Sequence, residues 1–66
     1  MNDREKLNNL KVLLDTLIDT CKSEVSITNK FLEKTTNNEE KIKLQNELAF
    51  WQGKLEVAEY IKYFIN

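Results

Sequence analysis

The sequence has no proline and a single glycine, Gly53, among its 66 residues. These two residue types interrupt helices most often, because proline lacks the amide hydrogen and glycine loses the most backbone entropy on folding. A chain that almost lacks them can form long, uninterrupted helices. We therefore expect an all-α fold.

Apolar residues recur at steps of three and four in the first half of the chain. At about 100° per residue they fall on one face, as expected for a helix with one buried side. We expect this helix to span about Asp3 to Lys34, with Asn2 or Asp3 as its N-cap. The members of this face are Leu7, Leu10, Leu14, Leu17, Ile18, Cys21, Val25, Thr28 and Leu32.

The polar segment TTNNEE, residues 35–40, interrupts this pattern. Thr36 with Glu39 fits a capping box, in which a hydroxyl and a carboxylate satisfy free amides at a helix start, and Asn37 with Glu40 fits nearly as well. A second helix is expected over about residues 38–65, with a turn at about 35–38. A short polar link between two long amphipathic helices favours an antiparallel hairpin, so residues 1–66 are expected to form one helical-hairpin domain.

The second helix carries two apolar stripes on different sides. We expect the first, called the inner stripe, to pack on the first helix; it comprises Leu44, Leu48, Trp51, Leu55, Ala58 and Ile65. Lys62 falls on the same line, so this end of the hairpin is expected to be loose or solvent-facing. The second, called the outer stripe, comprises Ile42, Ala49, Phe50, Gly53, Val57, Tyr60, Ile61 and Phe64. Because the first helix offers one apolar face, the outer stripe predicts an interface with another molecule.

Two features of the outer stripe bear on what covers it. Ala49 and Gly53 are four residues apart, a spacing that lets another helix approach closely, although a tolerated glycine, a slight bend or a ligand contact would also account for Gly53. Five of the six aromatic residues lie between residues 50 and 64, which is typical of an interface but also of a bundle core. The simplest prediction is that two hairpins pack through their second helices into a four-helix-bundle dimer, or form a higher oligomer.

The size of the chain also favours association. A chain of 66 residues buries a small core and is marginally stable unless a disulfide, a metal or a partner adds to it. The lone Cys21 excludes a disulfide within the chain, and one cysteine without any histidine argues against a zinc site. We expect Cys21 to be a small core residue, and this cysteine usage without a signal peptide predicts a cytoplasmic protein.

The sequence offers little catalytic chemistry. Histidine, the commonest general base, is absent, and no phosphate-binding loop or nucleophile grouping occurs. Asp15 and Asp19 lie one turn apart and are expected to be solvated. We therefore expect no enzyme activity, cofactor or metal. The net charge of −1, with interspersed signs, argues against a dedicated nucleic-acid binder, and no apolar run is long enough to span a membrane.

In size, composition and lack of catalytic groups the chain resembles the small accessory proteins that phages and plasmids direct at host proteins. Asn, Lys and Ile, which have AT-rich codons, supply 22 of the 66 residues, as in a low-GC bacterium or its phages. The resemblance implies a non-enzymatic, oligomeric interaction protein that inhibits or regulates a host protein. One alternative is an oligomer that sequesters a nucleotide second messenger in counter-defence, and a weaker one is a nucleic-acid-binding dimer. The candidate nucleotide contacts are Arg4, Lys6, Trp51, Lys54, Tyr60, Lys62 and Tyr63.

Overall fold

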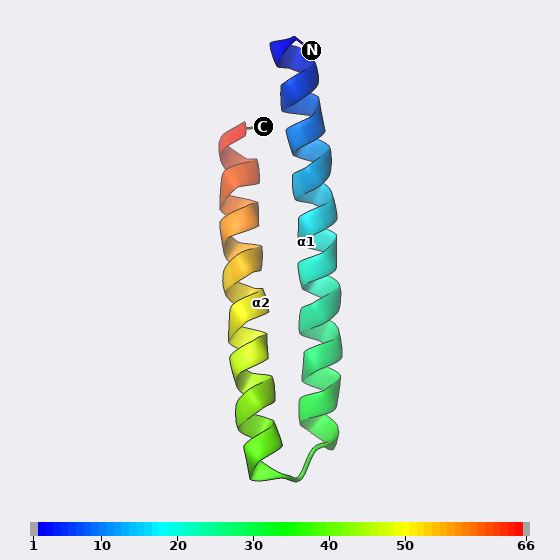
Figure 1. The fold of residues 1–66 in the computed structure, drawn as a ribbon, viewed down its shortest axis with the longest axis vertical. Helices are drawn as coiled ribbons and strands as arrows, with labels where there is room; N and C mark the ends of the chain where they lie inside the picture. The colour runs from blue at the N-terminus through cyan, green and yellow to red at the C-terminus, as the bar shows by residue number, and fades with distance from the viewer. Residues whose placement is uncertain (1, 66) are drawn as a thin grey trace.

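The computed structural model describes residues 2–65, which form two long helices side by side in an antiparallel hairpin (Figure 1). Helix α1 spans Asp3–Lys34 and helix α2 spans Asn38–Ile65, and residues 35–37 link them. The hairpin measures 52 × 16 × 15 Å. No strand occurs in residues 2–65, so the all-α hairpin predicted from the sequence is confirmed.

Side-chain and backbone caps explain where the helices begin and end. The Asn2 side chain accepts a hydrogen bond from the Glu5 amide at 2.8 Å, which satisfies a free donor at the start of α1. At the start of α2 the Asn37 side chain accepts from the Glu40 amide at 3.1 Å. Asn37, which directly precedes the first residue of α2, is therefore the N-cap, while the Glu40 carboxylate accepts from the Thr35 hydroxyl.

The core lies along the line where α1 and α2 meet. Leu14, Ile18, Cys21 and Thr28 of α1 are buried, and so is Ala58 of α2. The rest of the predicted inner stripe is half-buried, which confirms that this stripe faces α1. Cys21 has no exposed surface, as expected for a small core residue.

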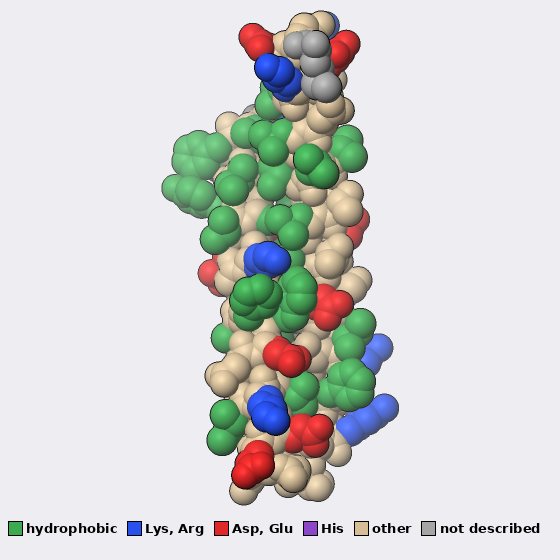
Figure 2. Space-filling model, viewed as in Figure 1, with side chains coloured by type: hydrophobic (Ala, Val, Ile, Leu, Met, Phe, Trp, Pro, Cys, Tyr) green, Lys and Arg blue, Asp and Glu red, His purple; other side chains and the backbone are tan. Residues whose placement is uncertain are grey.

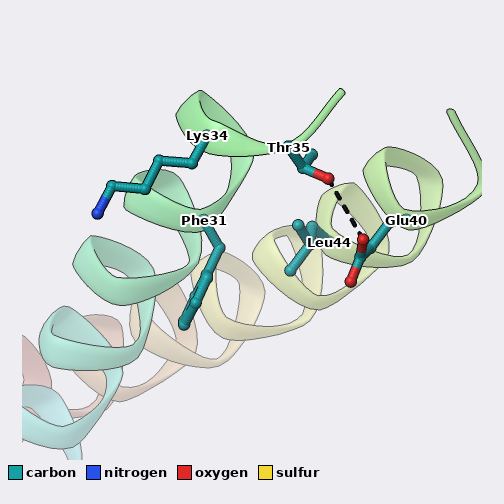
Figure 3. A pocket seen from close by; sticks show the side chains of 5 residues that line it. All are labelled: Phe31, Lys34, Thr35, Glu40 and Leu44. Carbon is teal, nitrogen blue, oxygen red and sulfur yellow. Dashed lines mark hydrogen bonds between the residues drawn. The ribbon is translucent and has the colours of Figure 1, made fainter. Parts of the chain in front are cut away.

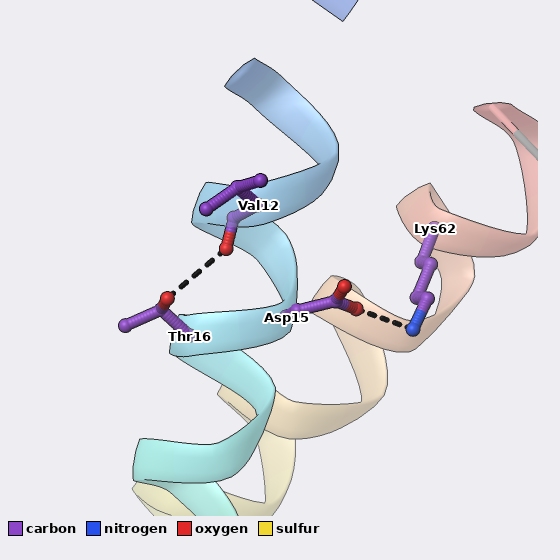
Figure 4. A network of polar contacts seen from close by, with 4 residues as sticks. All are labelled: Val12, Asp15, Thr16 and Lys62. Carbon is purple, nitrogen blue, oxygen red and sulfur yellow. Dashed lines mark hydrogen bonds and ion pairs between the residues drawn. The ribbon is translucent and has the colours of Figure 1, made fainter. Parts of the chain in front are cut away.

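Two expectations for the open end of the hairpin were wrong. Leu7 and Leu10 lie on the predicted buried face but are 40% and 41% exposed, because the first turns of α1 extend beyond the end of α2 (Figure 1). Lys62 is half-buried, and its ammonium group donates a hydrogen bond to the Asp15 carboxylate on α1 (Figure 4). The last turns of α2 are therefore tied to α1. Neither helix, over the residues described, combines the length and apolarity needed to cross a membrane.

Candidate functional site

The outer stripe of α2 is exposed along its whole length. All eight of its residues are exposed, and the accessible fraction of the six large ones runs from 41% for Ile61 to 67% for Phe64. This exposure follows from the geometry of a two-helix hairpin, because α1 can cover one side of α2 and the inner stripe occupies that side. An apolar surface of this extent on a small protein is typical of an interaction site.

The aromatic rings near the end of α2 pack on one another at the surface. The rings of Tyr60 and Phe64 lie 4.8 Å apart between centroids at an interplanar angle of 66°, and those of Tyr63 and Phe64 lie 5.8 Å apart at 88°. Such edge-to-face contacts orient the rings relative to one another. Tyr60, Tyr63 and Phe64 therefore present an ordered aromatic surface to solvent.

A second aromatic group lies near the middle of α2. The rings of Phe50 and Trp51 meet edge to face at 5.2 Å, and the ammonium group of Lys54 lies 5.1 Å from the Phe50 centroid and 5.2 Å from that of Trp51. At this distance the positive charge is attracted by both ring faces. The Lys54 charge is thus held over the aromatic surface.

No neighbouring atom in the hairpin explains why position 53 is a glycine. A Cβ atom added at Gly53 would meet no atom within 4 Å, and the backbone there has no positive φ. Helix α1 is therefore not the close neighbour that the Ala49–Gly53 spacing suggested, and the close approach of another chain stays a prediction. The space beside Gly53 is open to such a chain.

Helix α1 adds exposed apolar side chains that we did not assign to any interface from the sequence. Leu13 is 66% exposed and Phe31 is 58% exposed. On the face shown in Figure 2, hydrophobic side chains lie over both helices, most densely towards the free ends of the chain. The sequence signal for this surface is Leu10, Leu17 and Phe31, which fall on a seven-residue repeat interrupted by Glu24 and lie directly beside the buried face of α1.

A shallow hollow lies beside the turn (Figure 3). It is lined by Phe31, Lys34, Thr35, Glu40 and Leu44, and the Thr35 hydroxyl donates to the Glu40 carboxylate at 3.4 Å. Its volume of about 240 Å³ is below the roughly 300–1,000 Å³ of pockets that enclose drug-sized ligands. None of the candidate nucleotide contacts lines this hollow.

Those candidate contacts are spread over the hairpin. Arg4 and Lys6 belong to the first turns of α1, which extend past α2, whereas Lys54 lies over the rings of Phe50 and Trp51. Lys62 is paired with Asp15. A single chain thus does not gather these cations around one aromatic ring, and a nucleotide site would need residues from more than one copy.

Residues 2–65 contain no group of three or more His, Cys, Asp or Glu side chains arranged to hold a metal ion. No protein-family model, curated protein or solved structure matches the chain. The exposed apolar surface is therefore the feature on which a functional proposal can be built.

Proposed function

We propose that this chain is a small, non-enzymatic interaction protein that associates through the outer stripe of α2 and inhibits or regulates another protein. The observation that carries this proposal is the exposure of all eight outer-stripe residues in a hairpin whose α1 already packs against the inner stripe. Leaving this much apolar surface in water is unfavourable by about 25 cal/mol per Å², so covering it favours association. The setting we propose is the cytoplasm of a low-GC bacterium, with a phage or plasmid as the source of the gene.

The composition of the outer stripe supports protein binding. It combines branched apolar side chains with aromatic ones, and aromatic residues are enriched among those that carry the binding energy of interfaces. Gln45, Gln52 and Glu56 border the stripe and remain exposed. A polar border around an apolar centre is the usual organisation of an interface between soluble proteins.

The test compares two substitutions that each add one positive charge to α2. Val57→Lys places the charge in the outer stripe, and Gln52→Lys places it on the polar border. We expect Val57→Lys to weaken association by tenfold or more, roughly the effect of desolvating an unpaired charge, while Gln52→Lys behaves like the native chain. Sedimentation velocity measures self-association, and affinity capture from a low-GC bacterial lysate measures the binding of another protein.

Circular dichroism of both variants checks that the hairpin still forms. A protein captured by the native chain and by Gln52→Lys, but lost with Val57→Lys, would support the proposal. The proposal is wrong if the native chain stays monomeric at about 100 μM and captures no protein in a Val57-dependent way.

A further inference from the structure

The exposed apolar surface is not confined to α2, because one edge of α1 continues it. On α1, the residues Leu10, Leu17, Glu24 and Phe31 follow one another every seven positions. Seven residues make close to two helical turns, so these side chains line up beside the buried face of α1. Leu10 and Phe31 are exposed, Leu17 and Glu24 are half-buried, and Leu13 is exposed beside them.

Helix α2 has an equivalent edge. Glu47, Lys54 and Ile61 follow one another every seven positions beside its inner stripe, and Phe50, Val57 and Phe64 lie next to them on the outer side. Two antiparallel helices are related by a local two-fold axis, which brings equivalent edges to the same side of the pair. The edges of α1 and α2 thus flank one face, which we call the apolar face: Leu10, Leu13, Leu17, Phe31, Phe50, Val57, Ile61 and Phe64.

The opposite side of the hairpin is polar. The matching edge of α1 carries Asp15, Lys22 and Asn29, and that of α2 carries Gln45, Gln52 and Glu59, all of them exposed. The Asp15–Lys62 ion pair lies on this polar side (Figure 4). The edge beside the core is therefore largely apolar on one side of the hairpin and polar on the other, with Val12, Ile42 and Tyr63 as exposed apolar residues next to the polar edge.

The charges on the apolar face have a defined register. The Asp15–Lys62 pair fixes which residues of α1 and α2 lie side by side. Lys54 is eight residues before Lys62 on α2, and Glu24 is nine residues after Asp15 on α1. Because the helices are antiparallel, Lys54 and Glu24 lie at nearly the same height along the hairpin. The half of the face nearer the turn also carries Lys43 and Glu47, whereas apolar side chains predominate between this half and the charged first turn of α1 (Figure 2).

We propose that the apolar face binds a second copy of this chain, related to the first by a two-fold axis parallel to the hairpin. This inference rests on the proposed function and names the occupant of the Phe50, Val57, Ile61 and Phe64 part of the outer stripe. In this arrangement α1 of each copy lies against α2 of the other, and all neighbouring helices run antiparallel, as in an up-and-down four-helix bundle. The apolar half of each copy then meets the apolar half of the other.

Charge complementarity supports this symmetry. Glu24 of one copy lies level with Lys54 of the other, and the two-fold axis repeats the pair, because an isologous interface makes each contact twice. A two-fold axis perpendicular to the hairpin would instead set the apolar half against the charged half near the turn. One side of the whole hairpin measures about 52 by 16 Å, an outline of roughly 830 Å², so it has room for the ~800 Å² that each partner contributes to a specific interface.

The test uses two charge reversals that rescue each other only between chains. Glu24→Lys alone gives two lysine–lysine contacts in the dimer, and Lys54→Glu alone gives two glutamate–glutamate contacts. We expect each variant to associate about tenfold more weakly than the native chain, because two pairs of the strength of exposed ion pairs are reversed. An equimolar mixture restores both opposite-charge contacts in the mixed dimer, and its association returns to within about twofold of the native value.

A matched pair on the polar face controls for net charge. Asp19→Lys and Lys22→Glu carry the same charge changes at exposed positions of α1, and we expect native association from each alone and from their mixture. The parallel two-fold dimer is supported if mixing Glu24→Lys with Lys54→Glu restores association and mixing the two control variants gives no gain. No restoration, or the same gain in the control mixture, overturns it. Circular dichroism shows whether each variant remains helical.

Cross-linking of the native chain tests the same dimer geometry without relying on any substituted chain to fold. Chains labelled with ¹⁴N and ¹⁵N are mixed and treated with a carbodiimide, and we expect Glu24–Lys54 cross-links that join a light and a heavy chain. If the native chain self-associates but shows neither mixed cross-links nor rescue, the dimer geometry is wrong and the proposed function stands. A chain that stays monomeric overturns the dimer, and the proposed function then depends on the Val57-dependent capture of another protein.

Discussion

Replacing Gly53 with alanine should stabilise the protein, and the structure sets the size of the effect. Gly53 lies in the interior of α2 without a positive φ, so alanine can adopt the same backbone conformation. The added Cβ meets no atom within 4 Å, so no clash offsets the gain. Alanine is favoured over glycine inside a helix by about 1 kcal/mol. For a domain of this size that corresponds to a rise in melting temperature of about 4–8 °C.

Thermal unfolding followed by circular dichroism measures this gain. Native and variant chains are compared at the same concentration, because association makes the melting temperature depend on concentration. Gln52→Ala is the control, since it changes a neighbouring exposed residue whose helix propensity is already close to that of alanine. A gain for Gly53→Ala well above that of the control agrees with open space at Gly53. An unchanged or lower melting temperature would show that the assembled protein places atoms there, and would refute the reasoning.

Three further substitutions test the hairpin itself. Asn37→Ala removes the cap of α2 and should lower the free energy of unfolding by about 1 kcal/mol in urea titrations, and no loss would mean that the cap contributes nothing. Lys62→Leu extends the apolar inner stripe and removes an ion pair that contributes little, because its partners are 38% and 54% exposed. This substitution should therefore raise the urea midpoint of unfolding. A lower midpoint would show that the ion pair outweighs apolar burial. Cys21→Ser buries a hydroxyl group in place of a fully enclosed thiol and should cost about 1–3 kcal/mol. Thiol labelling of native Cys21 should proceed only through unfolding, and rapid labelling would contradict its burial.

The helices and their packing faces could be predicted from the sequence because they depend on local periodicity. The inner stripe and the Leu14–Ile18–Cys21 side of α1 recur at helical spacing, and no proline or additional glycine competes with it. The choice between Thr36 and Asn37 as the cap could not be made in this way. Both pairs satisfy the spacing, and only the structure shows that α2 begins at Asn38, directly after Asn37.

The errors have a common cause, which is that a helical wheel ignores how far each helix extends. Leu7 and Leu10 have the right angular position for burial, but α2 ends before it reaches them. Lys62 was expected to be loose because it interrupts an apolar stripe, yet Asp15 lies within reach on the other helix. Such pairs depend on which residues of the two helices lie side by side. This register cannot be deduced from the spacing of residues within one helix.

The exposed surface was predictable in part. The outer stripe of α2 could be predicted to be exposed because the single apolar face of α1 is already matched by the inner stripe. The apolar edge of α1 was overlooked because Leu10 and Leu17 belong equally to the buried face and to its border, and Leu13 and Phe31 alone do not form a periodic pattern. The side of the hairpin on which this edge lies follows only from the antiparallel arrangement of the two helices.

The central claim is that this apolar surface is covered by another copy of the molecule, and sedimentation equilibrium of the native chain tests it most directly. We expect the mass to rise with concentration towards twice the 7.8 kDa of one chain, with the transition complete by about 100 μM. A mass that stays at one chain over the whole range, together with cooperative unfolding that does not depend on concentration, would contradict the claim.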